Sequence, residues 1–110
     1  MLCVLTHRRL KPGAYEEFRS AWQPNEWWPA FRNGYHLRSA DDPDEVISFA
    51  FYDATPEEFE AIRDHPRWLE AEDQRLRRMA PFQVSAKLGG VYEVAEEFSR
   101  SSPTSPSSAG

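Results

Sequence analysis

The sequence has little cysteine and no long apolar run. Its one cysteine, Cys3, excludes an intrachain disulfide, so we expect a reduced, cytoplasmic setting. No apolar stretch approaches the roughly 20 residues that a transmembrane helix needs. The apolar run at residues 2–5 precedes the charged residues at 7–9, which is the reverse of the order in a secretory signal. We therefore expect neither membrane association nor export.

The chain also lacks an excess of positive charge. Its formal net charge is −5 over 110 residues, whereas a general nucleic-acid binder presents a basic face. It has no phosphate-binding glycine loop, no nucleotide fingerprint, and no Ser-His-Asp or Cys-His signature. Its three histidines, His7, His36 and His65, have no metal-ligand spacing on one helix. We expect no nucleic-acid partner, no metal and no cofactor.

Aromatic residues are plentiful by comparison. They make up 14% of the chain and include four tryptophans, which indicates a cavity wall, a dimer interface, or both. Residues 1–98 have the composition of one globular domain. Residues 99–110 are rich in serine and proline and nearly free of apolar side chains, so we predict a disordered tail.

The apolar pattern predicts four strands and two helical regions. The first helix is expected to begin at Gly13 and to carry a stripe of Tyr15, Phe18 and Trp22. Thr55 and Glu58 predict a capping box at the start of the second helical region. Gly89-Gly90 predicts a bulge in the last strand. The expected order is strand 2–10, helix from 13, strand 35–39, strand 45–53, helical segments from 55 and over 67–79, and strand 82–94. This order predicts an α+β, ferredoxin-like β-α-β-β-α-β fold with a four-stranded antiparallel sheet.

The third strand has no charge on either face between Val46 and Tyr52. Ile47, Phe49 and Phe51 share one face, and Ser48 and Tyr52 lie on the other. Strands with two uncharged faces are covered on both sides. One monomer's helices can cover only one face, so we expect a homodimer.

Several short motifs follow one another along residues 1–94. They are Leu10-Lys11-Pro12-Gly13, Arg38 with Asp41-Asp42-Pro43-Asp44, Tyr52-Asp53, Thr55-Pro56-Glu57-Glu58-Phe59, and His65-Pro66-Arg67-Trp68. In this combination the chain resembles the antibiotic biosynthesis monooxygenase family. The resemblance implies a dimeric α+β barrel with a ligand cavity between sheet and helices in each monomer. The family includes cofactor-independent oxygenases of aromatic polyketides and haem-degrading enzymes.

The resemblance also bears on the chemistry. Quinone-forming members place Asn and Trp where this chain has Ser48 and Tyr52, and an Arg near Glu72. Haem-degrading members ligate iron from the region that is Ala71-Glu72-Asp73 here, which contains no histidine. We therefore do not expect haem degradation.

Three residues are candidate catalytic groups. Glu72 falls within the apolar stripe of Leu69 and Leu76, so burial would raise the pKa of its carboxyl and suit it to act as a general base. Alternatively, Glu72 pairs with Arg75 or reaches the helix edge. His7 is a second candidate base. Tyr52 could orient a phenol or carbonyl, or could place its hydroxyl in water.

A second set of residues could bind the ligand. Ser48 shares the cavity face with Tyr52, and His36 could meet a ligand from the neighbouring strand or be a satisfied strand histidine. Aromatic residues could form a lid over a flat ligand, or could instead plug the open end of the layers or contact a partner subunit. These are Trp22, Trp27, Trp28, Phe31 and Trp68.

These residues favour a cofactor-independent monooxygenase or related tailoring enzyme that acts on a hydrophobic, aromatic, polyketide-like small molecule. In that mechanism a protein group removes a phenolic proton, and the electron-rich ring then reduces O₂. The alternatives are a cyclase or isomerase that uses the same cavity, and a non-catalytic small-molecule binding or dimerisation domain.

Overall fold

The computed structural model describes residues 1–100, and the residues 101–110 of the predicted tail lie outside them. The elements follow the predicted order, with the second helical region divided into two helices. They are β1 (Leu2–Leu10), α1 (Tyr15–Trp22), β2 (Phe31–Arg38), β3 (Glu45–Tyr52), α2 (Pro56–Asp64), α3 (Pro66–Met79), the 3-10 helix η1 (Ala80–Phe82) and β4 (Gln83–Glu93). None of the helices within residues 1–100 is both long and apolar enough to cross a membrane.

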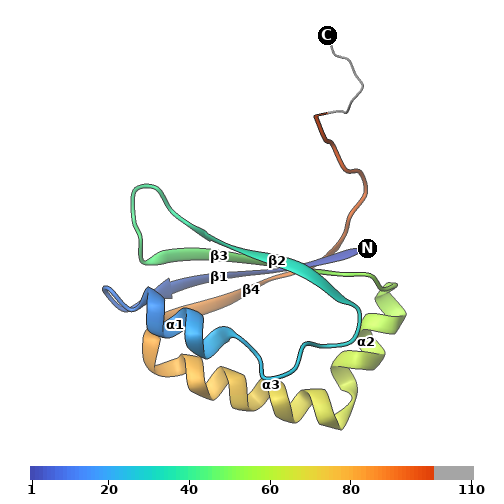
Figure 1. Cartoon of the computed structure of the whole chain (residues 1–110), viewed down its shortest axis with the longest axis horizontal. Helices are drawn as coiled ribbons and strands as arrows, with labels where there is room; N and C mark the ends of the chain where they lie inside the picture. Colours follow the sequence, from blue (N-terminus) through green and yellow to red (C-terminus); the bar gives the residue numbers. More distant parts are fainter. Residues whose placement is uncertain (101–110) are drawn as a thin grey trace.

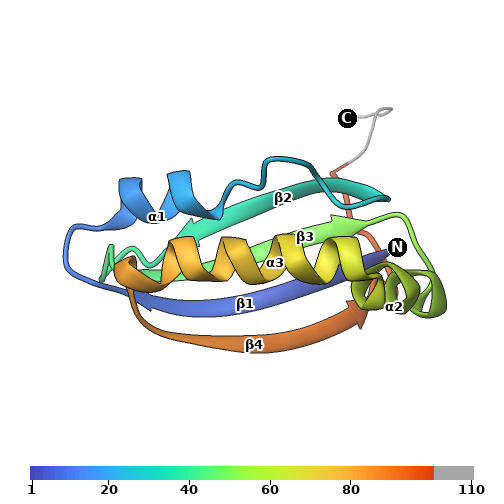
Figure 2. The ribbon, with the colours of Figure 1, turned by 90° about the horizontal axis from the view of Figure 1, so that it is seen from below.

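The four strands form one sheet in the order β2-β3-β1-β4, and the three pairings are antiparallel. All three α-helices lie on one side of this sheet (Figure 1). Figure 2 shows α3 lying along the sheet, with α1 beside β2 and α2 at the opposite end. This arrangement confirms the ferredoxin-like fold expected from the order of the elements.

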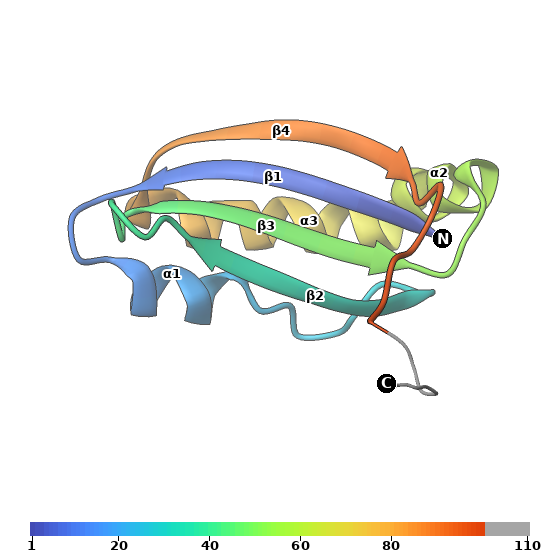
Figure 3. The same cartoon turned by 90° about the horizontal axis from the view of Figure 1, so that it is seen from above.

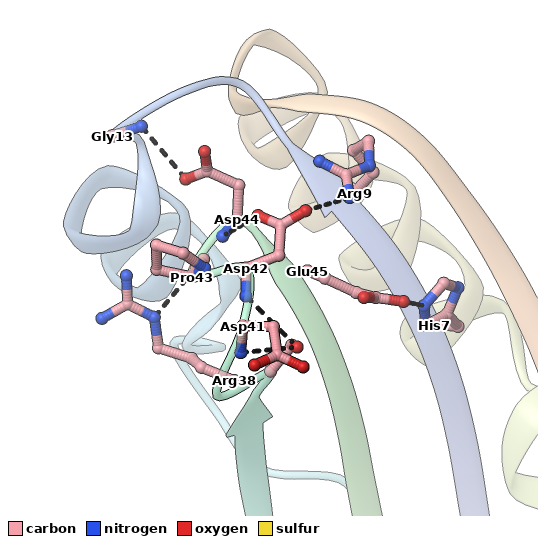
Figure 4. Close-up of polar contacts among 10 residues, drawn as sticks. His7, Arg9, Gly13, Arg38, Asp41, Asp42, Pro43, Asp44 and Glu45 are labelled. Carbon is pink, nitrogen blue, oxygen red and sulfur yellow. Dashed lines mark hydrogen bonds and ion pairs between the residues drawn. The ribbon is translucent and has the colours of Figure 1, made fainter.

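The first helix begins later than the sequence predicted. Gly13 adopts φ 73°, so it belongs to a turn in which the Ala14 N–H donates to the Lys11 carbonyl at 3.1 Å. The Gly13 N–H donates to Asp44 Oδ1 at 3.1 Å, which ties this turn to the acidic β2–β3 turn (Figure 4). The left-handed conformation of Gly13 thus delays the helix to Tyr15.

The capping box of α2 is confirmed. The Glu58 N–H donates to Thr55 Oγ1 at 3.1 Å, and the Thr55 N–H donates to Glu58 Oε1 at 2.8 Å. His65 separates α2 from α3, and its Nδ1 accepts a hydrogen bond from the Arg67 N–H at 3.2 Å. His65 therefore caps α3.

The second strand is longer than predicted. Asn33-Gly34, which the sequence suggested as a turn, lies inside β2 and pairs with Phe51 and Ala50. A Cβ at Gly34 would lie 2.6 Å from the Phe49 carbonyl oxygen, so glycine here permits close approach of the backbones. In β4, by contrast, the predicted bulge is confirmed, because the pairing with β1 shifts at Gly89.

One cluster of buried apolar residues packs at one end of the space between sheet and helices. It consists of Leu10, Phe18, Ala21, Val46 and Met79. These residues come from the end of β1, from α1, from the start of β3 and from the end of α3. The rest of the space, toward α2, is not filled by this cluster.

The other face of the sheet carries no helix from residues 1–100 (Figure 3). We call it the open face. Tyr35 and Leu37 are exposed on it, and Tyr35 contacts Phe51 edge to face at a centroid distance of 6.3 Å. Phe49 and Ile47 are partly exposed there. These side chains form an apolar patch on the open face that is largely uncovered.

Candidate functional site

A cavity of about 580 Å³ lies between the helix-facing side of the sheet and α3. Its volume is within the range of small-molecule sites. Eight of the predicted site residues line it: Trp22, Trp27, Trp28, Phe31, Ser48, Tyr52, Trp68 and Glu72. The alternation of β3 and the helical period of α3 bring four of these residues to the cavity, and the segment from the end of α1 to the start of β2 supplies the other four.

The connection between α1 and β2 supplies an aromatic wall. The rings of Trp27 and Phe31 stack at 4.3 Å with an interplanar angle of 10°. Trp22 meets Trp27 edge to face at 5.9 Å. Trp28 packs against Phe59 of α2 at 5.9 Å. Phe59 was not among the predicted site residues, although the apolar stripe of α2 contains it.

Tyr52 stands near the α2 end of the cavity. Burial, opposed by the charge of Arg75 and assisted by that of Glu72, raises the pKa of its phenol to about 12. The hydroxyl is therefore protonated at neutral pH and acts as a donor. It has no hydrogen-bond partner among residues 1–100, so it is free to donate to a ligand.

Ser48 connects two basic side chains. Its Oγ lies 2.8 Å from His36 Nδ1 and accepts a 3.3 Å hydrogen bond from Arg8 Nη1. Burial, and then the charges of Arg8, Arg75 and Arg19, lower the pKa of His36 to about 4. His36 is thus neutral at pH 7. It does not line the cavity itself but lies directly behind Ser48.

Arg8 is a charged residue of the cavity lining that the sequence analysis missed. It lines the cavity, its relative exposure is 4%, and its guanidinium lies 5.3 Å from the centre of the Phe18 ring. Burial, followed by repulsion from Arg75, lowers its pKa to about 10, so it stays charged at neutral pH. The signal was present in the sequence, because the alternation of Leu2, Val4 and Thr6 continues to Arg8.

Glu72 lines the cavity but is not a free base. Arg75 Nε donates to Glu72 Oε1 at 3.0 Å, and Arg75 Nη2 donates to Oε2 at 2.8 Å. Arg75 also donates to the Trp22 carbonyl at 3.0 Å. The sequence left two possibilities for Glu72, a buried carboxyl without a partner and an ion pair with Arg75. The structure shows the ion pair. That pair is partly buried, with side-chain exposures of 16% for Arg75 and 31% for Glu72.

His7 does not reach the cavity. Strand alternation places it on the open face, opposite to Arg8, and its Nε2 lies 2.7 Å from Glu45 Oε2 (Figure 4). The expectation that His7 acts as the base in this cavity is therefore not met by its position. Residues 1–100 contain no cluster of three or more histidine, cysteine, aspartate or glutamate side chains suited to a metal ion.

Several solved structures have a similar arrangement of strands and helices. A candidate antibiotic biosynthesis monooxygenase from Nitrosomonas europaea is similar, with a TM-score of 0.62 and 20% identity over 87% of this chain and 100% of that one. SnoaB, a cofactor-independent oxygenase from Streptomyces nogalater, is similar with a TM-score of 0.61 and 14% identity over 87% and 94%. A candidate antibiotic biosynthesis monooxygenase from Deinococcus radiodurans has a TM-score of 0.62 and 12% identity over 93% and 100%.

Comparison by sequence gives a different result. No protein-family model matches the chain, and no curated protein matches it. The resemblance to the antibiotic biosynthesis monooxygenases is thus confirmed at the level of the fold. At these identities the fold alone is shared, so the chemistry has to be argued from the cavity.

Proposed function

We propose that the protein is a cofactor-independent monooxygenase that acts on a flat, phenol-like aromatic small molecule of the polyketide type. The observation that carries this proposal is the cavity of about 580 Å³, which combines an aromatic wall with inward-facing polar side chains. The structural similarity to SnoaB, named as a cofactor-independent oxygenase, supports it.

The residues around the cavity suit this chemistry in specific ways. A flat ring can lie against the stacked pair of Trp27 and Phe31. The protonated Tyr52 hydroxyl can donate to a carbonyl or phenolic oxygen and so orient the ring. His36 is neutral, and its Nδ1 lies 2.8 Å from Ser48 Oγ, which holds this hydroxyl at the cavity wall. With a pKa of about 4, His36 is too weak a base to take a phenolic proton, so that proton leaves to solvent water.

The reaction balances without a cofactor. Loss of the phenolic proton makes the ring electron-rich, and the anion transfers an electron to O₂. Combination of the two radicals forms a peroxide anion on the ring carbon that is a CH₂ in the keto tautomer and carries one hydrogen in the phenol. The peroxide takes up the proton that the phenol released. Loss of water, which removes the remaining hydrogen of that carbon, then leaves a new carbonyl, so one oxygen atom enters the product and the other leaves as water. The apolar wall keeps bulk water from the intermediates.

We further propose that the protein functions as a homodimer joined through the open face. Phe49 and Ile47 are partly exposed there, and Tyr35 and Leu37 are more so. A contiguous apolar face of this kind marks an interaction surface. A second copy of the same sheet would cover it and leave each cavity on the outside of the sheet pair.

A non-catalytic binding protein is the second candidate. The observation that favours it is the ion pair between Glu72 and Arg75. Glu72 lies in the middle of α3 and lines the cavity, and the pairing leaves its carboxylate unavailable as a base. A cyclase or isomerase would need the same acid and base groups as the oxygenase but would not consume O₂.

Oxygen consumption distinguishes these functions. An anthrone is incubated with the protein in an oxygen-electrode cell, with and without a chelator, and the product is identified by mass. The proposal expects one O₂ consumed per carbonyl formed, chelator-independent turnover, and a loss of at least about tenfold in Tyr52→Phe. Tyr35→Phe on the open face is the matched control. A rearranged product without O₂ uptake would indicate the isomerase, and tight binding without turnover would indicate the binder.

A further inference from the structure

We propose that the cavity binds its aromatic ligand as an oxyanion, a carboxylate or an ionised phenol, and that the buried guanidinium of Arg8 holds the charged oxygen. This inference deepens the proposed function and rests on it for the site, although binding can be measured without turnover. It names both the ligand's charge and the residue that recognises it.

The first argument is the state of Arg8 itself. A guanidinium carries five N–H donors and one full positive charge. At 4% exposure, Arg8 has one long hydrogen bond, to Ser48 Oγ at 3.3 Å, and its Nε has no partner among residues 1–100. Buried charges are normally paired, because an unpaired one is costly to desolvate. An anion in the adjoining cavity would complete the site.

The second argument is that no carboxylate of the cavity is available to Arg8. The charge of Glu72 raises the pKa of Arg8, but both Glu72 oxygens accept hydrogen bonds from Arg75. Glu26, at the mouth, pairs with Arg67. The counter-ion of Arg8 must therefore come from outside the described chain.

The third argument is the sign of the charge around the cavity. The chain as a whole has a net charge of −5, yet more cations than anions line this cavity. The charged lining residues are Arg8, Arg63, Arg67, Arg75 and Arg78, against Glu26 and Glu72. Arg63, Arg67 and Arg75 are paired with Glu60, Glu26 and Glu72, so Arg8 and Arg78 supply the excess positive charge. A low-dielectric cavity with an excess of one sign of charge concentrates ligands of the opposite sign. The lining thus favours anions even though the protein is acidic.

The position of Arg8 also orients the ligand. Arg8 pairs with Val46 of the buried cluster. Tyr52 lies at the α2 end, where its ring meets that of Phe59 at 5.0 Å. From Ser48, which Arg8 contacts, to Tyr52 the strand rises about 13 Å. An aromatic oxyanion bound at Arg8 would therefore extend along β3 beneath the aromatic wall, with its far end near the Tyr52 hydroxyl.

An ionised phenol at this position also serves the proposed reaction. A neighbouring cation lowers the pKa of a phenol, because it stabilises the charged form. The proton can then leave to solvent water as the ligand binds, and the bound anion is the species that donates an electron to O₂. Arg8 would thus act on the ligand's ionisation directly, which removes the need for a free carboxylate base.

Three ligands of similar shape test the inference. They are 2-naphthoate, its neutral counterpart 2-naphthamide, and 4-nitro-1-naphtholate, an ionised phenol. Binding is followed by quenching of tryptophan fluorescence and checked by calorimetry. We expect at least one of the two anions to bind tenfold or more tightly than the amide, and the preference between them to identify the oxyanion. Arg8→Gln should reduce the anion preference to less than about threefold.

Arg77→Gln provides the matched control. It removes the same charge from an exposed α3 position outside the cavity lining, and it should retain the anion preference. If Arg8→Gln fails to fold, Arg8→Lys keeps the charge without the paired donors and should weaken the preference for the carboxylate. The comparison of the three ligands on the wild-type protein remains decisive in either case.

The outcomes separate this inference from the proposed function. Equal binding of the anions and the amide by the wild-type protein would overturn it, and so would an unchanged preference in a folded Arg8→Gln. Oxygen-dependent turnover with no anion preference would leave the oxygenase standing and remove the role of Arg8. An Arg8-dependent anion preference without O₂ uptake would support the inference and reject the oxygenase.

Discussion

Replacing Arg8 by methionine should stabilise the ligand-free protein. Methionine keeps the length and apolar bulk of the side chain but removes the charge. The pKa of Arg8 is lowered from 12.5 to about 10, chiefly by burial. A lowered pKa for a basic group means that the folded state disfavours the charged form at neutral pH. At 1.36 kcal/mol per pKa unit, that penalty is about 3 kcal/mol.

Two favourable contacts are lost in the same substitution. The hydrogen bond to Ser48 Oγ is long, at 3.3 Å, and is worth about 1 kcal/mol. The cation–π contact with Phe18, at 5.3 Å, is worth about another 1 kcal/mol. The free energy of unfolding should therefore rise by about 1 kcal/mol. For a domain of this size that corresponds to an increase of roughly 5 °C in the melting temperature.

The measurement is urea unfolding at pH 7 without ligand, with Arg77→Met as the control. Arg77 is exposed, so its substitution should change the free energy of unfolding by less than about 0.5 kcal/mol. The penalty of the buried charge is present at pH values below the folded-state pKa of about 10. Above that pH the folded state loses the proton before the unfolded state does, so the free energy of unfolding of the wild type should rise there. A loss of more than about 2 kcal/mol in Arg8→Met would show that Arg8 is a satisfied structural residue and would refute the reasoning.

Four other outcomes are expected. Phe49→Asp should convert the dimer to a monomer or unfold it, because it places a charge on the apolar patch of the open face. Light scattering measures the molar mass, and a wild-type protein that is a stable monomer would reject the dimer. Glu72→Gln should lower the free energy of unfolding by about 2 kcal/mol, because it removes one charge from a partly buried, doubly hydrogen-bonded ion pair. It should also tighten 2-naphthoate binding by freeing Arg75, whereas a hundredfold loss of turnover would restore Glu72 as the base. The ring C2 proton of His36 should show no titration by NMR between pH 5 and 8, since its pKa is about 4; a midpoint near 6.5 would contradict the desolvated site. Thr55→Ala should cost about 1 kcal/mol in chemical unfolding by removing one half of the capping box, and no change would mean that α2 is held by packing alone.

The local chemistry of the sequence was sufficient for most of the fold. The capping box of Thr55 and Glu58 and the bulge at Gly89 depend on neighbouring residues and on strand period, so they were predictable. The lengthening of β2 was not. Asn33-Gly34 resembles a turn locally, and only the close approach to the Phe49 carbonyl explains a glycine inside the strand.

The members of the site were likewise largely predictable, since strand alternation placed Ser48 and Tyr52 on one face. Their partners were not. The alternation does not state which face the helices cover, and that choice sends Arg8 into the cavity and His7 to the open face. The helical period placed Glu72 toward the sheet, but only the packing of α3 decides that its oxygens meet Arg75.

The sequence by itself therefore determined the order of the elements and which side chains share a face. The tertiary structure decided which charges are buried, which are paired, and which is left without a counter-ion. The reason is physical. Secondary structure follows from short-range geometry along the chain, whereas the cost of a buried charge depends on the solvent and partners that all the packed elements together leave to it.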